Sequence, residues 1–451
     1  MISRPLGSVL CGTVFLGLTL GVPAASAGPA DAAGSAYQAW RSAIASSLKS
    51  PGGSAGSKLA SAKPAPVAGG QVVTTADNDT NGDGSVDERS ITTTNFDKAG
   101  RVVRTADEFD TGADGTVEAS TVVTTEYDKS GNATRQVSVS NINHLGSGGD
   151  GSVYETATNI TTYDSKGHPV RQVAELDEDS NGTLEMRSTT TYVNDAKGNV
   201  LQTVLEVDQG ANGSVDFRAS TTATYDQQGN QLDLVSESDQ SPGDNVPDAR
   251  FHTATSYDAD GNPVEQTSEF DDGADGTIDA TSHDVLTYDQ DGRVLTVLSE
   301  VDDDGDGDLS YRQTGTFTYS SKGQLLEQVF EADQADPGGT IDGLIDQVQS
   351  STLEYDARGN VVREVAFAQQ TGFPPLIQTT LQEYDSRGNL VSHQAEADFN
   401  GDNTIDVRIS SVSTYNSRGQ LLTATTDVDS DGNGTIDQTS VVTTVYDGVK
   451  R

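Results

Sequence analysis

The stretch NVLQTVLEVDQGANGSVDFRASTTATYDQQGN, residues 199–230, contains one complete unit of the repeat that decides the fold. An aliphatic segment leads into an Asp/Asn/Gly-rich loop, and a Thr-rich segment follows and ends in a Tyr-Asp-x-x-Gly turn. Phe217, Ala219 and Tyr225 lie on one face of the Thr-rich segment if its side chains alternate with period two. The unit therefore predicts two β-strands joined by an acidic loop and followed by a tight turn.

The unit recurs along most of the chain. Self-similarity at a fixed period of 20 to 50 residues is typical of a repeat array. We assign the turn to twelve positions, about 31 residues apart, which begin at Phe96, Tyr127, Tyr163, Tyr192, Tyr225, Tyr257, Tyr288, Tyr319, Tyr355, Tyr384, Tyr415 and Tyr446.

Twelve such hairpins predict an all-β fold, a long antiparallel meander of about 24 strands over residues 71–447. Because long open sheets twist and coil, we expect a curled ribbon or a spiral sheet. A six-bladed β-propeller with two repeats in each blade is the alternative.

The composition favours a thin, hydrogen-bonded structure over one with a thick core. Only 33% of the residues are hydrophobic, and the formal net charge is -42. A polyanion repels nucleic acid, and the chain has no basic patch, so we exclude nucleic acid as a partner.

The first 27 residues are typical of a secretory signal peptide. Arg4 precedes an apolar stretch, and Ala25-Ser26-Ala27 forms a small-residue cleavage site. We expect a helix and a Pro/Gly/Ser/Ala-rich linker over residues 28–70, and a short tail at residues 448–451. No later apolar run is long enough for a transmembrane helix, and the only cysteine, Cys11, lies in the signal segment. The sequence therefore predicts a secreted chain, extracellular, at the cell surface or periplasmic.

The loops between paired strands carry the chemistry. Alternate carboxylate and amide oxygens on a tight turn converge on one point, which suits Ca²⁺ better than Mg²⁺. We predict calcium ligands in five strong loops, namely Asp79/Asn81/Asp83/Asp87, Asp177/Asp179/Asn181/Glu185, Asp302/Asp304/Asp306, Asp398/Asn400/Asp402/Asp406 and Asp429/Asp431/Asn433/Asp437. Three further loops keep the outer acids, namely Asp110/Asp114/Glu118, Asp208/Asn212/Asp216 and Asp271/Asp275/Asp279. The alternative is that Asp, Asn and Gly only make solvated turns.

The tyrosines and the cations at the turns are two further sets of residues with a predicted role. The tyrosines predict a structural ladder in which each ring packs across to the next hairpin, with an aromatic glycan platform as the alternative. Cations gather at the turns, so one edge of the sheet should be basic and the other acidic. The five histidines are scattered without ligand spacing, and no nucleophile accompanies them, so we expect no enzyme activity.

The turns followed by an aliphatic strand resemble the YD repeats of RHS-type proteins. The segments at 355–362 and 384–391 are the nearest matches. The resemblance implies a large curled β-sheet that either encloses a toxin or serves at the cell surface. The acidic loops are similar to the calcium-binding hairpin loops of integrin-type propeller blades.

Together these patterns predict a calcium-binding β-repeat protein that serves as a structural or adhesive scaffold. Its expected partners are Ca²⁺ and a surface polysaccharide, a cell-surface protein or a second copy of itself. An RHS-type shell or toxin-delivery component, and a glycan-binding module, are the alternatives.

Overall fold

The chain forms two units, Met1–Lys63 and Pro64–Arg451, and all described residues belong to the second. The computed structural model describes residues 69–143, 152–240, 242, 246–335 and 339–447. The predicted signal peptide, helix, most of the linker and the tail at 448–451 therefore lie outside the described residues.

The described residues form 24 β-strands. Most strands contain nine or ten residues, close to the length that the repeat predicts. Their bounds are β1 Gln71–Asp79, β2 Glu88–Phe96, β3 Val102–Thr111, β4 Ala119–Tyr127, β5 Ala133–Asn143, β6 Ser152–Tyr163, β7 Pro169–Asp177, β8 Met186–Asn194, β9 Val200–Gln209, β10 Phe217–Tyr225, β11 Gln231–Asp239, β12 Ala249–Tyr257, β13 Pro263–Asp272, β14 Ala280–Tyr288, β15 Val294–Asp302, β16 Tyr311–Tyr319, β17 Leu325–Gln334, β18 Gln347–Tyr355, β19 Val361–Gln370, β20 Leu376–Tyr384, β21 Leu390–Asp398, β22 Val407–Tyr415, β23 Leu421–Asp429 and β24 Gln438–Asp447.

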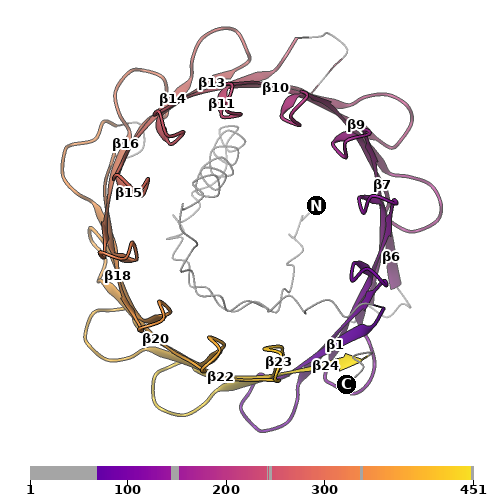
Figure 1. The fold of residues 1–451 in the computed structure, drawn as a ribbon, viewed down its shortest axis with the longest axis vertical. Coiled ribbons are helices and arrows are strands. Elements are labelled where there is room, and N and C mark those ends of the chain that lie inside the picture. Colours follow the sequence, from indigo (N-terminus) through magenta and orange to yellow (C-terminus); the bar gives the residue numbers. More distant parts are fainter. Residues whose placement is uncertain (1–68, 144–151, 241, 243–245, 336–338, 448–451) are drawn as a thin grey trace. The chain divides into compact units, whose positions relative to one another are not determined.

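The strands form one antiparallel meander that closes into a barrel (Figure 1). Each strand pairs with its sequence neighbours, as β9 pairs with β10 and β10 with β11. The last strand returns to the first: β24 pairs with β1 from Gln71↔Asp447 to Asp79↔Thr439. No strand in the described part of the chain is left with a free edge. A ring of 24 strands spaced by about 4.8 Å has a circumference of about 115 Å and a diameter of about 37 Å.

This closure corrects the predicted fold. The number of strands and their pairing in hairpins are confirmed, but the ribbon or spiral sheet is wrong because its two ends join. The six-bladed propeller is also wrong, because the strands form one continuous sheet and not separate blades. Hairpin sequences specify pairing between neighbours, whereas closure depends on curvature summed over 24 strands, which no single repeat encodes.

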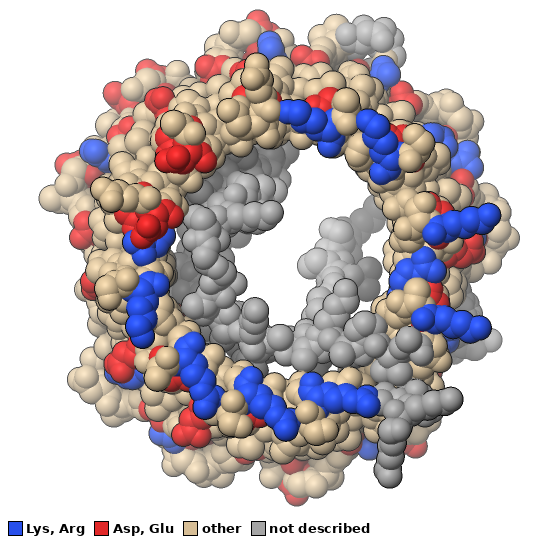
Figure 2. Space-filling model, in the orientation of Figure 1, with Lys and Arg blue, Asp and Glu red and all other residues tan. Residues whose placement is uncertain are grey.

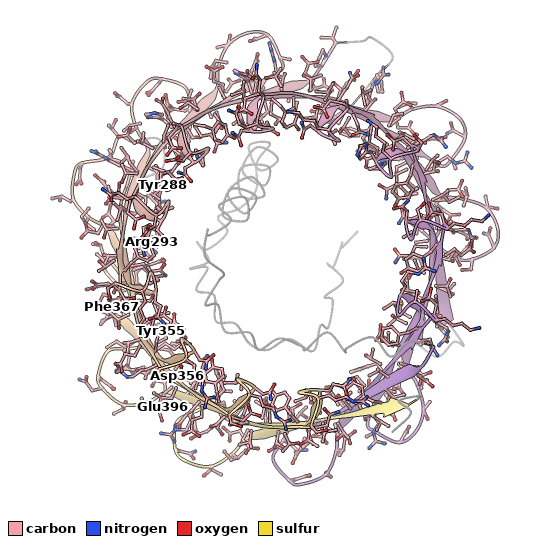
Figure 3. All side chains as sticks on the ribbon, in the orientation of Figure 1. Tyr288, Arg293, Tyr355, Asp356, Phe367 and Glu396 are labelled. Carbon is pink, nitrogen blue, oxygen red and sulfur yellow. The ribbon has the colours of Figure 1, made fainter. Side chains whose placement is uncertain are left out.

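Side chains are packed more tightly on the inner face of the wall than on the outer face. Tyr288 and Tyr355 lie on the inner side of the wall, whereas Phe367 and Glu396 lie on the outer side (Figure 3). Alternation along the strands then assigns every other residue to a face. The inner, concave face holds buried apolar residues such as Leu286, which is 6% exposed. The outer, convex face spreads its side chains, so Val412 there is 59% exposed.

The structure corrects the predicted position of one turn. At Tyr192 the turn begins two residues later, because Asp195 N–H donates to the Asn199 carbonyl and Gly198 N–H to the Asp195 carbonyl. The spacing from Tyr163 to Asn194 is then 194 - 163 = 31 residues, in line with the other repeats. Tyr192 itself is an ordinary strand residue of β8.

Tyrosines at the ends of the even strands form the expected ladder, but inside each hairpin. The Tyr225 hydroxyl donates to the carbonyl of Val200, at the start of the strand paired with its own. Tyr288 reaches Pro263 and Tyr355 reaches Leu325 in the same way. The hydroxyls therefore tie the two strands of one hairpin together, and the predicted contact with the next hairpin is also present at Tyr446, which packs against Val72 and Phe96.

Candidate functional site

The barrel presents two chemically different rims and a wall. One rim carries the Tyr-Asp turns, and the other carries the acidic loops. Lys and Arg side chains are spaced around the turn rim (Figure 2). Cations gather at the turns as expected, but most of these turns also hold an aspartate, so the rim is nearly neutral and the expected basic edge is not found.

Several cations on the turn rim bind the next turn along the ring. Lys166 Nζ donates to the carbonyl of Ala196 at 3.0 Å, and Arg358 donates to the carbonyl of Asp385 at 2.8 Å. Arg387 donates to the carbonyl of Ser417, also at 2.8 Å. These bonds span about one repeat in sequence, so the turn rim is cross-linked from turn to turn.

The turn aspartates are structural. Asp128 Oδ1 accepts from the N–H groups of Ser130 and Asn132, and Oδ2 accepts from Asn132 Nδ2 at 2.9 Å. The hydrogen bond from the Asn132 side chain, helped by its backbone N–H, lowers the pKa of Asp128. The same latch recurs at Asp258, Asp356 and Asp385. Both carboxylate oxygens of each of these aspartates therefore already accept hydrogen bonds within their own turn.

Most described acidic loops are organised around an aspartate that is the last or the next-to-last residue of an odd strand. Asp177 Oδ1 accepts from Asn181 N–H at 3.0 Å, and Oδ2 accepts from Gly182 N–H at 2.8 Å. Asp110 and Asp208 bind the backbone of their loops in the same way. Many of the carboxylate oxygens predicted to bind calcium therefore accept hydrogen bonds that shape the loop. This is expected if Asp, Asn and Gly only make solvated turns.

The structure brings the predicted acids together in four loops. In each of these, three carboxylates offer oxygen atoms that lie within 4.8 Å of one another. The four groups are Asp110/Asp114/Glu118, Asp177/Asp179/Glu185, Asp302/Asp304/Asp306 and Asp429/Asp431/Asp437. These groups stay predicted metal ligands. Asn181 and Asn433 belong to two of the same loops, where their side chains donate to Asp179 and Asp431.

The other predicted loops hold their acids for hydrogen bonding. Asp83 accepts from Ser85, and the Ser85 hydroxyl together with its N–H lowers the pKa of Asp83. Asp402 and Asp275 bind Thr404 and Thr277 similarly. No close three-acid group forms among the described residues of these loops, which contain Asp79, Asn81, Asp87, Asp208, Asn212, Asp216, Asp271, Asp279, Asp398, Asn400 and Asp406.

The outer wall carries rows of ion pairs that the sequence interpretation missed. Directly opposed residues pair across the acidic-loop end of the hairpins, as Glu175 does with Arg187 at 2.7 Å and Glu396 with Arg408 at 2.8 Å. An acid followed by an arginine twelve or thirteen residues later was the available signal. The six pairs are Asp77–Arg89, Glu175–Arg187, Glu206–Arg218, Glu237–Arg250, Glu300–Arg312 and Glu396–Arg408.

A second set of charges lies on the outer wall nearer the turns. The outward position four residues before the paired acid is charged in two of the paired hairpins, at Arg171 and Asp233. The equivalent position is also charged in five hairpins without such a pair, at Arg104, Arg135, Glu265, Glu327 and Arg363. Four strand residues span about 14 Å. A transmembrane barrel needs an outward apolar band of about 25 Å. The two charged rows therefore leave too short a band to cover the hydrocarbon core of a bilayer.

The inner wall is mostly Thr, Ser, Gln, Ala and aliphatic residues, with a few isolated titratable groups. Burial raises the pKa of Glu364 and lowers that of His393. Glu364 pairs with Thr380 and His393 pairs with Gln382 in the strand register. Burial also raises the pKa of Asp284, despite a hydrogen bond from Ser299.

Comparisons with known proteins give no family. No family model matches the chain, and no curated protein matches it. A porin-like protein from Bacteroides uniformis aligns at 11% identity over 85% of this chain and 99% of its own, with a TM-score of 0.22. OprB from Pseudomonas putida aligns at 8% identity over 83% and 91%, with a TM-score of 0.15. Identities and TM-scores at this level do not establish a shared fold or function.

These findings correct the family and the function expected from the sequence. The resemblance to YD-repeat and integrin-type blade proteins is not borne out, because no family model matches and the strands close into one barrel. The adhesive scaffold is also wrong, since the closed wall is held by backbone pairing and offers no free strand edge in the described chain. A single ring of strands is not an enclosing shell, and we find no support for the glycan platform, because the tyrosine hydroxyls bind backbone carbonyls. No described helix is long and apolar enough to cross a membrane.

Proposed function

We propose that this chain is exported and acts as a hydrophilic conduit, a ring through which hydrated solutes or an extended polymer pass. The observation that carries the proposal is the pairing of β24 with β1, which turns the meander into a tube. Interior side chains fill a barrel of about eight strands, whereas barrels of 16 to 18 strands leave an aqueous channel. A wall of 24 strands is wider still.

The polarity of both faces supports a conduit that works in water. The outer wall carries the Glu–Arg rows, and the inner wall mixes small polar residues such as Ser268 and Thr380 with aliphatic ones. Strands of nine to twelve residues are long enough to cross a bilayer, which favours a membrane channel as a second candidate. Burying the outer charged rows in lipid costs more free energy than burying the short band between them provides.

The two rims differ in charge, because most turns hold an aspartate beside their cation whereas the loops carry mainly acids. Anions are therefore repelled more strongly from the acidic loop rim than from the nearly neutral turn rim. At physiological salt the Debye length is about 8 Å, which is less than half of the backbone radius of the wall, about 18 Å. Selection by charge therefore acts on solutes near the wall and weakly on those that pass along the axis.

Sized thiol reagents test the open lumen. Cys11 is replaced by Ser, and single cysteines are placed at neighbouring positions on opposite faces, Ala223→Cys inside and Thr222→Cys outside. We expect maleimide-polyethylene glycols to label both positions of the folded mature chain. If large reagents label position 222 but fail at 223, while a small iodoacetamide labels both, the lumen is blocked and the conduit is rejected.

Liposomes separate the two candidates. The charged outer wall predicts that the chain stays with the aqueous phase in a flotation gradient and releases no dye from vesicles. Flotation with dye release would instead favour the membrane channel and would overturn the water-borne ring.

A further inference from the structure

The loop that joins β23 to β24 contains a buried carboxylate oxygen without a partner. Asp429, the last residue of β23, is 1% exposed. Its Oδ2 accepts a hydrogen bond from Gly434 N–H at 2.8 Å, and Arg408 Nη1 lies 3.8 Å from the same oxygen. Its Oδ1 is buried and accepts no hydrogen bond. Buried polar atoms in native proteins almost always have a partner, so this oxygen points to a missing one.

Equivalent aspartates in the other acidic groups do not share this feature. Asp110 and Asp177 each accept a backbone N–H on both oxygens. Asp302 does the same, with Gly305 on Oδ1 and Gly307 on Oδ2. In the β23–β24 loop, Asn433 N–H is directed to Asp431 Oδ1 instead, which leaves Asp429 Oδ1 without a donor. Asp429 therefore differs from these aspartates in its hydrogen bonds and not in the number of acids in its loop.

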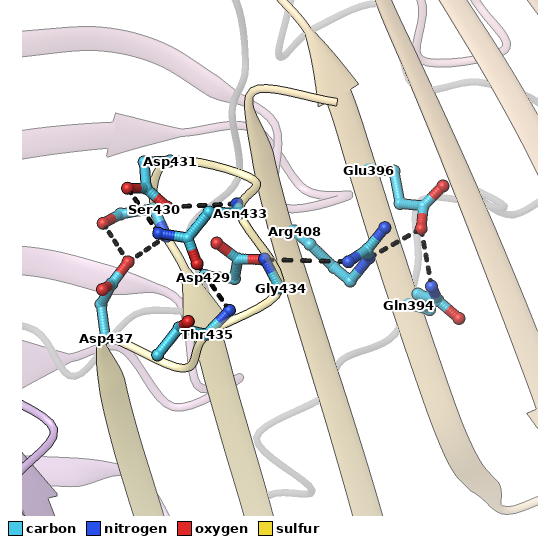
Figure 4. Close-up of polar contacts among 10 residues, drawn as sticks. All are labelled: Gln394, Glu396, Arg408, Asp429, Ser430, Asp431, Asn433, Gly434, Thr435 and Asp437. Atoms are coloured by element: carbon cyan, nitrogen blue, oxygen red, sulfur yellow. Dashed lines mark hydrogen bonds and ion pairs between the residues drawn. The ribbon is translucent and has the colours of Figure 1, made fainter. Parts of the chain in front are cut away.

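Two further carboxylates lie close to the carboxylate of Asp429. Asp429, Asp431 and Asp437 each offer an oxygen within 4.8 Å of the others (Figure 4). Asn433 Nδ2 holds Asp431 at 2.7 Å, and Ser430 N–H and Oγ hold Oδ2 of Asp437 at 2.7 and 2.6 Å. The three side chains are thus oriented by the loop itself before any ligand arrives.

The charge at this point is not balanced by protein groups. Three carboxylates at such distances repel one another. Arg408 is the cation that lies near them, and its Nε also bonds Glu396 at 2.8 Å. A small cation placed among the carboxylates would relieve this repulsion and give Asp429 Oδ1 a partner.

We propose that the β23–β24 loop is a binding site for one hard divalent cation. Asp429 supplies the buried ligand, and Asp431 and Asp437 supply the carboxylates at the loop surface. An all-oxygen set of carboxylates suits Ca²⁺, whereas Mg²⁺ keeps its waters and demands near-octahedral geometry. The inference does not depend on the conduit, because it concerns one loop at one rim.

Calorimetric titration with Ca²⁺ tests the site in a chain that retains one three-acid group. The background variant carries Asp114→Asn, Asp179→Asn and Asp304→Asn, which remove one exposed carboxylate from each of the other groups. We expect one saturable binding event in the full mature chain with these changes. The absence of saturable binding overturns the proposal.

Two matched substitutions separate a site from a diffuse ion cloud around an acidic chain. Asp431→Asn removes a ligand, and we expect it to weaken binding by on the order of tenfold or more. Asp427→Asn removes the same charge two residues before Asp429, outside the three-acid group, and should leave binding unchanged. Equal loss in both variants, or no loss in Asp431→Asn, rejects the site. Far-UV circular dichroism confirms that each variant folds, and Asp437→Asn replaces Asp431→Asn if that variant does not.

Discussion

Asn194 Nδ2 donates a 2.8 Å hydrogen bond to the carbonyl oxygen of Pro169, 25 residues earlier in the chain. In other hairpins a tyrosine hydroxyl makes this bond, as Tyr225 does to Val200 at 3.0 Å. Two unrelated side chains therefore perform the same task at the same point of the repeat. The task is to hold the start of one strand against the end of its partner, at the rim where the turn begins.

Tyr225→Phe removes this bond while keeping the ring. We expect a loss of about 1 kcal/mol in the free energy of unfolding, since one hydrogen bond contributes about that much net. Urea denaturation followed by circular dichroism measures the change. Tyr192→Phe is the control, because that hydroxyl bonds only the side chain of Gln172, at 3.3 Å, and its loss should be smaller. Equal losses would show that the carbonyl bond has no special role.

Closure of the barrel can be trapped covalently. Thr74 and Thr444 face each other across the β1–β24 seam, and their Oγ1 atoms lie 3.4 Å apart. Opposed residues of an antiparallel pair have Cα atoms about 4.5 to 5.5 Å apart, a distance that a disulfide spans. Thr74→Cys with Thr444→Cys, in a chain with Cys11→Ser, should therefore oxidise to an intramolecular bridge, detected by mass spectrometry and non-reducing electrophoresis.

The control for closure moves one cysteine by a single residue. Thr443 lies beside Thr444 but on the other face of β24. Thr74→Cys with Thr443→Cys should stay reduced under the same conditions. A ribbon whose ends do not meet would leave both pairs reduced.

The sequence predicted local structure well and global structure poorly. Alternation around Phe217 and Tyr225 predicted β10, and the observed strand ends at the expected residue. Pairing within a hairpin depends on residues a few positions apart, which the sequence displays. The contact of Thr74 with Thr444 joins residues 370 positions apart, and neither residue differs from other strand threonines.

The sequence predicted where the acidic loops lie, but not which of them bring three carboxylates together. The sequence placed carboxylates in eight loops, and the structure brings three together in four of them. Asp398 and Asp429 occupy the same repeat position, yet Asp398 Oδ1 accepts Gly401 N–H at 2.6 Å while Asp429 Oδ1 accepts none. Which oxygen is saturated depends on the path of the loop backbone, and composition does not encode that path.

Contact between neighbouring loops predicts an unequal response of two nearby glycines. Gly305 has a φ of +69°, and a Cβ on it would lie 2.3 Å from the carbonyl oxygen of Ile278. Gly307 has a φ of +93°, and a Cβ there would meet nothing within 4 Å. Gly307→Ala should cost about 1 to 2 kcal/mol from backbone strain alone. Gly305→Ala should cost clearly more, because the loop must also move away from its neighbour. Thermal unfolding of both variants measures the difference, and equal midpoints would contradict the loop contact.

Two buried groups of the inner wall predict opposite pH dependences. Burial lowers the pKa of His393 from its ordinary value of 6.5, so the unfolded chain takes up this proton first as the pH falls. Stability should then decrease below about pH 6.5, and His393→Gln should reduce that decrease. Burial raises the pKa of Glu364 from 4.5, so its contribution is fully present below that value and is lost as the pH rises through the folded pKa.

Glu364→Gln should therefore stabilise the barrel near neutral pH and have little effect in acid. Denaturant midpoints of the two variants and the parent chain, measured from about pH 4 to pH 8, give the comparison. Glu327→Gln serves as the control, since this glutamate is exposed on the outer wall and its substitution should shift the midpoint little at any pH. If Glu364→Gln and Glu327→Gln gave the same profile, the effect would come from the net charge of the chain and not from burial on the inner wall.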